Sequence, residues 1–158
     1  MTRSGEPVHD NGGPALNRVL AQVERLLTRR IEAVLSSRGM TIDQWRVVDL
    51  LADGEGHPMS EIAAAIVVPG PTLTKIVDRL VDAATVYRLV DSRDRRRVLA
   101  FLSDDGRALH TELAPRVADI EQAALATLPD GAPGLLDVLD HLAREPLARE
   151  PATSARAR

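Results

Sequence analysis

The side chains with the clearest chemical purpose in this sequence are the arginines of the segment 86–102. This segment holds five arginines and two aspartates, whereas the whole chain has a formal charge of −3. Guanidinium groups bind phosphate through paired N–H donors, and a cationic patch on an otherwise acidic protein is typical of a surface that meets nucleic acid. These residues therefore indicate phosphate recognition.

The arginines are concentrated in the turn of a predicted β-hairpin, called the wing. The segments 86–90 and 97–102 are rich in β-branched and apolar residues, which predicts two strands with the charged turn between them. Such a tip can place a guanidinium in the narrow minor groove of DNA, and we expect Asp94 to orient that guanidinium. A basic turn without a binding role is the simpler alternative. The candidate wing residues are Arg93, Asp94, Arg95, Arg96 and Arg97.

A pair of predicted helices precedes the wing with helix-turn-helix spacing. The segment 59–66 is short and alanine-rich, the turn 68–71 contains two prolines and a glycine, and a second helix runs from Thr72 to about Ala83. The leading end of the second helix meets base edges in such motifs, and its amide groups favour phosphate. A solvated helix face is the alternative. The candidate contacts on this helix are Thr72, Thr74, Lys75 and Arg79, with Asp78 also pointing outward.

A long amphipathic helix is predicted over 14–39. Its apolar residues recur every three or four positions, and Gly39 ends it with a left-handed cap. Further apolar side chains, such as Leu26, suggest that this helix joins two copies of the chain. A helix that lies across a monomeric core is the alternative. The candidate dimerisation residues on this helix are Leu16, Val19, Leu20 and Val23.

Polar capping residues mark other helix starts. Thr41 and Gln44 form a predicted capping box, and Ser103 is a predicted N-cap followed by two aspartates that suit the helix dipole. We expect Pro115 to kink the helix that follows Ser103, and a short amphipathic helix over 135–142. The predicted fold class is therefore mainly α with a small β-hairpin.

Composition argues against several classes of function. Trp45, Tyr87 and Phe101 are the three aromatic residues, which is too few for base stacking on single strands. There is no cysteine for thiol chemistry, and no apolar run of the ~18 residues that cross a bilayer. The N-terminus lacks a signal-peptide pattern, so we expect a cytoplasmic protein. The polar ends, 1–13 and 144–158, are expected to be disordered.

The sequence also lacks the patterns of an enzyme. It has no Ser-His-Asp grouping and no glycine loop for phosphate. The histidines show no close metal-ligand spacing, so we expect neither metal nor cofactor. They are His9, His57, His110 and His141.

The order of these features resembles the MarR family, the multiple-antibiotic-resistance regulators. The resemblance covers about residues 16–142 and is most specific over 71–106. There, the segment 91–97 (DSRDRRR) followed by 102–106 (LSDDG) is similar to the family's wing and the start of its next helix. The resemblance implies a DNA-binding transcriptional regulator.

In domain terms, the resemblance implies one winged helix-turn-helix domain over 14–143. The lobe 41–102 would bind DNA, and the helices within 14–39 and 103–143 would join a homodimer. The fourth helix would enter successive major grooves of a pseudo-palindromic duplex, and the wing would enter the flanking minor grooves through Arg93 or Arg95, held by Asp94. The dimerisation residues that the resemblance adds are Leu135, Leu139 and Leu142.

The resemblance further implies repression that a small phenolic or lipophilic effector relieves. We place a candidate effector pocket near Trp45 and His110, and a core role for Trp45 is the simpler alternative. Two departures from the family concern the recognition helix. Ala84 stands where the family usually has glycine, which would cost about 1 kcal/mol in a left-handed conformation. The turn 69–71 (PGP) is also unusually rigid.

A second hypothesis has the same fold but a different partner. A winged-helix module could use its basic hairpin to bind an acidic protein. Only the regulator predicts a preference for one duplex sequence over scrambled DNA.

Overall fold

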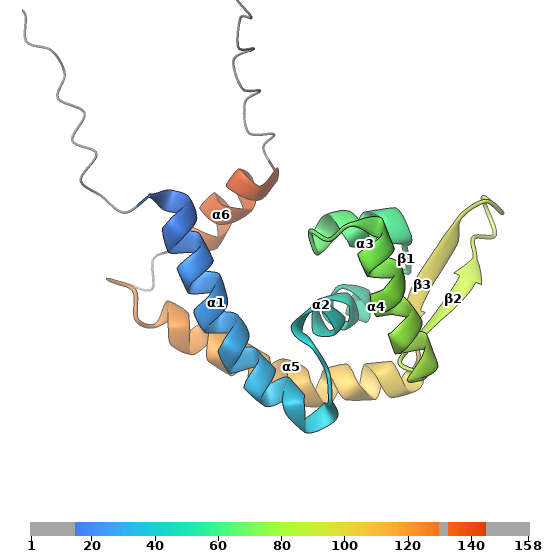
Figure 1. The fold of residues 1–158 in the computed structure, drawn as a ribbon, viewed down its shortest axis with the longest axis horizontal. Helices are drawn as coiled ribbons and strands as arrows, with labels where there is room; N and C mark the ends of the chain where they lie inside the picture. Colours follow the sequence, from blue (N-terminus) through green and yellow to red (C-terminus); the bar gives the residue numbers. More distant parts are fainter. Residues whose placement is uncertain (1–14, 130–132, 145–158) are drawn as a thin grey trace, which may run out of the picture. The chain divides into compact units, whose positions relative to one another are not determined.

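The computed structural model describes residues 15–129 and 133–144 (Figure 1). The chain divides into two compact units, one that ends at Glu121 and one that begins at Gln122. Of the two tails that the sequence predicts to be disordered, residues 1–13 and 145–158 lie outside the described residues, whereas Arg144 is the last residue of a helix. The described residues form six α-helices and three strands, mainly helical as expected.

The first unit contains the predicted helix-turn-helix and wing. Its helices are α1 (Leu16–Leu35), α2 (Ile42–Leu50), α3 (Met59–Ala65), α4 (Gly70–Asp82) and most of α5 (Asp104–Leu125). Its strands are β1 (His57–Pro58), β2 (Val86–Val90) and β3 (Val98–Leu102). The second unit contains the end of α5 and α6 (Leu135–Arg144).

Local polar signals set the helix boundaries as predicted. The Thr41 hydroxyl accepts the Gln44 amide while the Gln44 side chain accepts the Thr41 amide, which completes the capping box of α2. Gly39, with φ 61°, ends the 3-10 turn after α1, and the Ser103 hydroxyl accepts the Gly106 amide at the start of α5. Helix α5 then continues through Pro115.

Two features differ from the prediction around α3 and α4. Helix α4 begins at Gly70, because a proline in the first turn of a helix needs no amide partner and Pro71 therefore fits inside it. Helix α3 begins at Met59 as predicted, but the two residues before it, His57 and Pro58, form a short strand that the sequence did not predict. His57 pairs with Ala100, so the sheet has the antiparallel order β1-β3-β2.

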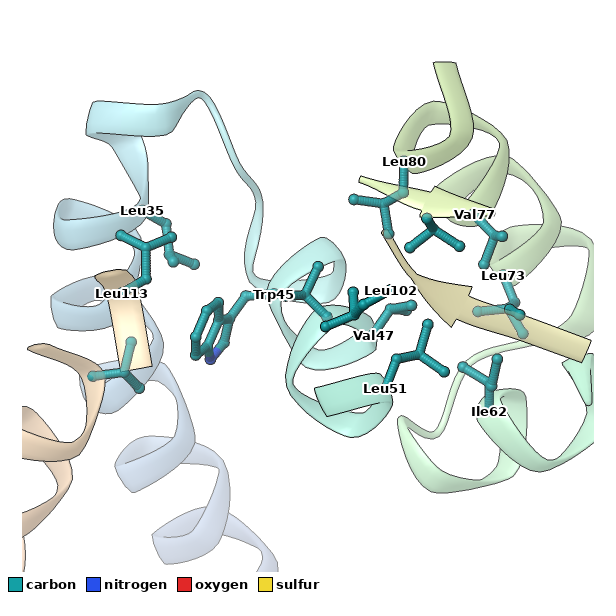
Figure 2. Close-up of a cluster of buried hydrophobic side chains, with 14 of the residues drawn as sticks. Leu35, Trp45, Val47, Leu51, Ile62, Leu73, Val77, Leu80, Leu102 and Leu113 are labelled. Atoms are coloured by element: carbon teal, nitrogen blue, oxygen red, sulfur yellow. The ribbon is translucent and has the colours of Figure 1, made fainter. Parts of the chain in front are cut away.

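One hydrophobic core holds the first unit together (Figure 2). Leu35, Trp45 and Leu113 bring together α1, α2 and α5, and further buried side chains join α2 to the helix-turn-helix and the sheet. Burial of a large aliphatic side chain contributes about 1.5–3 kcal/mol. In helix α4 the buried residues are Leu73, Val77 and Leu80, which share one face. This face packs against the core, and the opposite face is left to solvent. The fully buried large side chains are Leu35, Leu51, Ile62, Leu73, Leu80, Leu102, Leu113, Val47, Val48, Val77 and Val86.

In the described ranges, no single helix has the length and apolar composition to cross a membrane. Helices α3 and α4 reach that composition only as a pair, and a bend of 106° separates them.

Candidate nucleic-acid interface

Helix α4 presents its predicted contact residues to solvent. Thr72, Thr74, Lys75 and Arg79 are all exposed, whereas the alternate face of the helix is buried. The Thr74 hydroxyl donates to the Gly70 carbonyl at 3.1 Å, so it is engaged with its own helix. Lys75 and Arg79 therefore supply the positive charge of this face.

Two aspartates shape the backbone of the wing tip. The Asp91 carboxylate accepts the Arg93 amide at 2.8 Å, and the Asp94 carboxylate accepts the Arg96 amide at 3.0 Å. The expected pairing of Asp94 with a guanidinium is corrected, since no ion pair joins it to an arginine within the described ranges. The reason is local: a short carboxylate reaches the amide two residues ahead more easily than a long side chain that points into water.

The five arginines of the hairpin fall into two groups. Arg93, Arg95 and Arg96 at the tip are exposed and form no ion pair in the part of the chain that the structure describes. By contrast, the Arg88 guanidinium lies 2.7 Å from an Asp78 carboxylate oxygen on α4, and the Arg97 guanidinium lies 3.1 Å from Glu61 on α3. The first group is available for phosphate, and the second is engaged within the protein.

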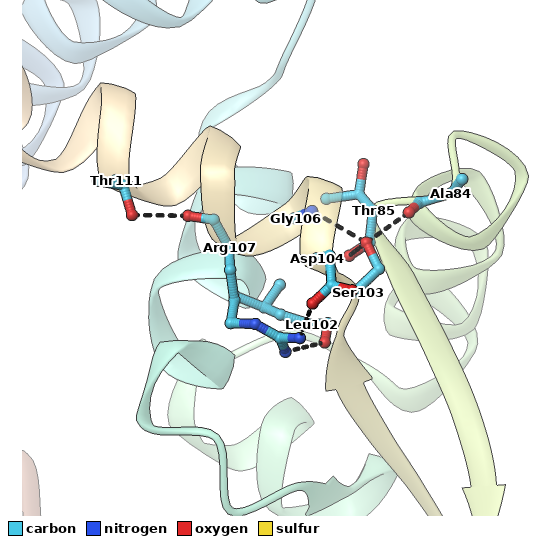
Figure 3. A network of polar contacts seen from close by, with 8 residues as sticks. All are labelled: Ala84, Thr85, Leu102, Ser103, Asp104, Gly106, Arg107 and Thr111. Carbon is cyan, nitrogen blue, oxygen red and sulfur yellow. Dashed lines mark hydrogen bonds and ion pairs between the residues drawn. The ribbon is translucent and has the colours of Figure 1, made fainter.

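A network of hydrogen bonds fixes the passage from α4 into the wing (Figure 3). The Ser103 hydroxyl donates to the Ala84 carbonyl at 2.6 Å, and the Ser103 amide donates to the Thr85 carbonyl at 3.0 Å. Gly106 is buried beneath this turn, and a Cβ on it would lie 2.2 Å from the Thr85 carbonyl oxygen. The start of α5 thus holds the turn that positions β2 relative to α4.

Sequence reasoning missed the residues that support this interface. From the sequence, Asp78 is only an outward-pointing residue of the second helix and Glu61 has no assigned role, because their partners lie 10 and 36 residues away. The family-like segment 102–106 (LSDDG) does contain Ser103 and Gly106. Their contact with the turn after α4 is visible only in the folded chain.

The predicted dimerisation residues leave apolar surface on α1. Leu16, Leu20 and Val23 are 61, 40 and 47% exposed, and Val19 is half-buried. On α6, Leu142 is also exposed, whereas Leu135 and Leu139 are half-buried.

Trp45 and His110, the predicted effector-pocket residues, stack with ring centroids 5.4 Å apart. Trp45 is only 4% exposed, which also satisfies its predicted role in the core. The His110 Nε2 atom lies 3.0 Å from an Asp49 carboxylate oxygen. Neither ring lines the neighbouring groove of about 560 Å³, which shares Asp49 with this cluster. The groove is lined by Glu24, Arg46, Asp49, Leu50, Ala65, Ile66 and Val67.

Acidic groups dominate the electrostatics around this groove. Arg46 pairs with both Glu24 and Asp43 at 3.1 Å, and the Thr28 hydroxyl together with Arg46 lowers the pKa of Glu24. Partial burial and the nearby Asp49 carboxylate raise the pKa of Glu121. In the described ranges, no group of three or more potential ligand side chains is arranged to hold a metal ion.

The geometry agrees with comparisons to known proteins. A MarR family model matches residues 38–97. The HTH-type transcriptional regulator FarR of Neisseria gonorrhoeae is 32% identical over 103 residues, which are 65% of this chain and 70% of that protein. The homoprotocatechuate degradative operon repressor of Escherichia coli is 24% identical over 71% of this chain and 73% of its own length.

Solved structures show the same fold. NadR in complex with 4-hydroxyphenylacetate superposes with a TM-score of 0.78 at 30% identity, over 89% of this chain and all of that chain. MarR from E. coli, in its apo form, gives a TM-score of 0.67 at 25% identity, over 82% and 95% of the two chains.

Proposed function

The chain belongs to the MarR family of transcriptional regulators, and on that premise we propose that it is a cytoplasmic homodimeric repressor that an organic effector releases from DNA. The observation that supports DNA binding is the set of exposed cationic side chains on the wing tip and on α4. Three tip arginines without an ion pair in the described ranges lie on the same lobe as Lys75 and Arg79 of an exposed helix face. Such a lobe can meet the major groove with α4 and the minor groove with the wing.

Dimerisation is supported by the apolar surface of α1 and α6. A water-exposed row of leucine and valine side chains on an amphipathic helix is stabilised when a second copy covers it. Two copies would also place two recognition helices on one duplex, which a pseudo-palindromic operator requires. The proposed dimerisation residues remain Leu16, Val19, Leu20, Val23, Leu135, Leu139 and Leu142.

An effector is supported by the groove beside Asp49. Its volume of about 560 Å³ is in the range of small-molecule sites, and one structural neighbour was solved with 4-hydroxyphenylacetate. His110 contacts Asp49, which lines the groove, and Trp45 stacks on His110, so both rings would sense occupation of the groove indirectly.

The first experiment measures binding of the purified protein to the DNA upstream of its own gene by fluorescence anisotropy. A scrambled duplex is the control, and a salt series gives the number of phosphate contacts. Tight and selective binding, with a log–log salt slope of about −0.9 per phosphate neutralised, is the expected result. If both that duplex and duplexes selected from random sequences bind no better than scrambled DNA, the regulator proposal is wrong, and an acidic protein partner becomes the better hypothesis.

The same assay tests the wing residues. Arg95→Ala should weaken binding and reduce the steepness of the salt slope by about 1 for each wing that loses a phosphate contact. The matched control is Arg116→Ala, which removes an exposed arginine from α5. Mass measurement of both variants separates a loss of DNA contacts from a loss of the dimer.

A further inference from the structure

We propose that Asp78 and Glu61 are positioning residues that hold the wing against the helix-turn-helix, and so strengthen DNA binding without touching DNA. The proposal deepens the proposed function and rests on it. It assigns a role to two acidic side chains that lie beside the cationic residues of this lobe.

The hairpin needs such a support because its core contacts are confined to its base. The buried side chains of the hairpin are Val86, Ala100 and Leu102. Towards the tip, Val90 and Val98 are 60 and 40% exposed, and residues 92–97 are all exposed. Strand β1 pairs with β3 only at Ala100 and Leu99, so beyond these residues the wing is a two-stranded ribbon, which is marginally stable alone. The outer part of the wing therefore depends on contacts other than burial.

The first support joins the middle of β2 to α4. Arg88 directs its guanidinium to Asp78 at 2.7 Å, and the two side chains are 31 and 50% exposed. Asp78 lies one turn beyond Lys75 and next to Arg79 on the outward face of α4. On a face that meets phosphate, an unpaired carboxylate would weaken binding by repulsion. A carboxylate that holds β2 through Arg88 would instead strengthen binding by keeping the wing in the orientation that fits DNA.

The second support joins the tip to α3. Arg97 directs its guanidinium to Glu61 at 3.1 Å. The backbone carbonyl of Arg97 accepts the Asp91 amide, and this bond closes the tip. Glu61 also lies 3.8 Å from His57 Nδ1, and the other ring nitrogen of His57 is 2.7 Å from Asp53. The carboxylate that holds Arg97 is therefore itself placed by β1 and α3.

An ion pair of this kind changes the affinity for DNA by changing how often the wing is in its binding orientation. If the wing loses one ion pair, it spends a smaller fraction of its time in the orientation that fits both grooves, and the apparent dissociation constant rises in inverse proportion to that fraction. An exposed pair shifts such an equilibrium by up to about fivefold, and a dimer has two wings, so the combined effect reaches up to about 25-fold.

The test depends on the sign of the change. Asp78→Ala removes a negative charge from a DNA-facing helix, so simple electrostatics predicts tighter binding, whereas loss of a positioning residue predicts weaker binding. The matched control is Asp82→Ala, which removes the same charge from the same helix, where Asp82 is exposed and forms no ion pair within the described ranges. Both variants are measured by anisotropy on the duplex that the wild-type protein selects.

The expected result is a dissociation constant raised about five- to 25-fold by Asp78→Ala and unchanged or lowered by Asp82→Ala. Adding Arg88→Ala to Asp78→Ala should then cause little further loss, because Arg88 acts through Asp78. Glu61→Ala should weaken binding in the same direction, with Glu55→Ala as its control. If Asp78→Ala leaves the dissociation constant unchanged or lowers it, as Asp82→Ala does, the proposal is wrong.

Hydrogen exchange on the free protein separates this proposal from the proposed function. Amides of residues 87–101 should exchange faster in Asp78→Ala than in Asp82→Ala, with thermal stability of the two variants as the check on global unfolding. Unchanged exchange overturns the positioning role even if the protein binds DNA. If exchange is faster in Asp78→Ala but the protein selects no duplex, the positioning role of Asp78 is supported and the regulator proposal is wrong.

Discussion

Helices α3 and α4 end in the same backbone motif, but only the second end is joined by hydrogen bonds to a distant part of the described chain. Val67 after α3 and Ala84 after α4 both have φ 56°, and the amide of the following residue donates to a carbonyl five residues earlier in each case. This motif usually has glycine at the left-handed position. Both turns therefore place a residue other than glycine in the left-handed conformation, one at each end of the recognition helix.

Their surroundings are different. The Val67 side chain is 87% exposed, and its neighbours Ile66 and Val68 are half-buried against the core. After α4, Thr85 is buried, and Ser103 and Gly106 fix the turn against the start of α5. Backbone hydrogen bonds within the turn and apolar packing therefore hold the entry to α4, whereas hydrogen bonds to a distant part of the chain also hold the exit towards the wing. Substitutions at the exit should therefore lower the free energy of unfolding by more than substitutions at the entry raise it.

The largest effect is expected for Gly106→Ala. Alanine normally stabilises a helix by about 1 kcal/mol relative to glycine, but here the new Cβ would meet the Thr85 carbonyl oxygen at 2.2 Å and force the backbone apart. We expect the free energy of unfolding to fall by about 3 kcal/mol, measured by urea denaturation. The control is Gly70→Ala at the start of α4, where a Cβ meets nothing within 4 Å. Equal behaviour of the two variants would mean that the exit turn is not tightly packed.

Ser103→Ala should have the next largest effect. It removes the hydroxyl that accepts the Gly106 amide and donates to the Ala84 carbonyl. Loss of an N-cap and of a bond to a neighbouring turn should cost about 1–2 kcal/mol in the same assay. Ser37→Ala is the control, because the Ser37 hydroxyl bonds only to the Val34 carbonyl within its own helical turn. A cost no larger than that of the control would show that α5 does not hold the exit turn.

At the entry turn, Val67→Gly should stabilise the protein by about 1 kcal/mol. A left-handed conformation is costly for a β-branched residue and not for glycine, and little burial is lost because the side chain is exposed. Thermal unfolding measures the gain. Val67→Ala keeps a Cβ at the strained position and should give a clearly smaller gain. A destabilised Val67→Gly protein would mean that this side chain has a partner, such as DNA or a second copy.

The smallest effect is expected for Ala84→Gly, a gain of about 0.5 kcal/mol, because alanine is less strained than valine in the left-handed region. Thermal unfolding again measures it, in parallel with DNA affinity. If the gain exceeds that of Val67→Gly, the turn after α4 is the more strained of the two, and the tertiary bonds hold it against a larger cost.

Much of this molecule follows from local chemistry in the sequence. Thr41 and Gln44 define the start of α2, the left-handed Gly39 follows α1, and the 3.6-residue spacing of Leu73, Val77 and Leu80 decides which face of α4 is buried. Ala84 stands where the family usually has glycine, and its φ of 56° shows that it adopts the left-handed conformation. The capping and spacing features depend on neighbours within a turn or two, so the sequence contains their causes. The sequence did not reveal the left-handed Val67, because a β-branched residue rarely adopts that conformation.

Tertiary structure alone decided how the charges are divided. The sequence presents five arginines in one hairpin as equivalent, but Arg88 and Arg97 are paired with Asp78 and Glu61, while the arginines between them are not. Likewise, the sequence cannot show that Ser103 meets the turn after α4, or that His57 pairs with β3. Each of these contacts joins residues that are far apart in the chain. An ion pair or a ladder bond forms only when the packed core brings both partners within about 3 Å, and local propensity carries no record of that distance.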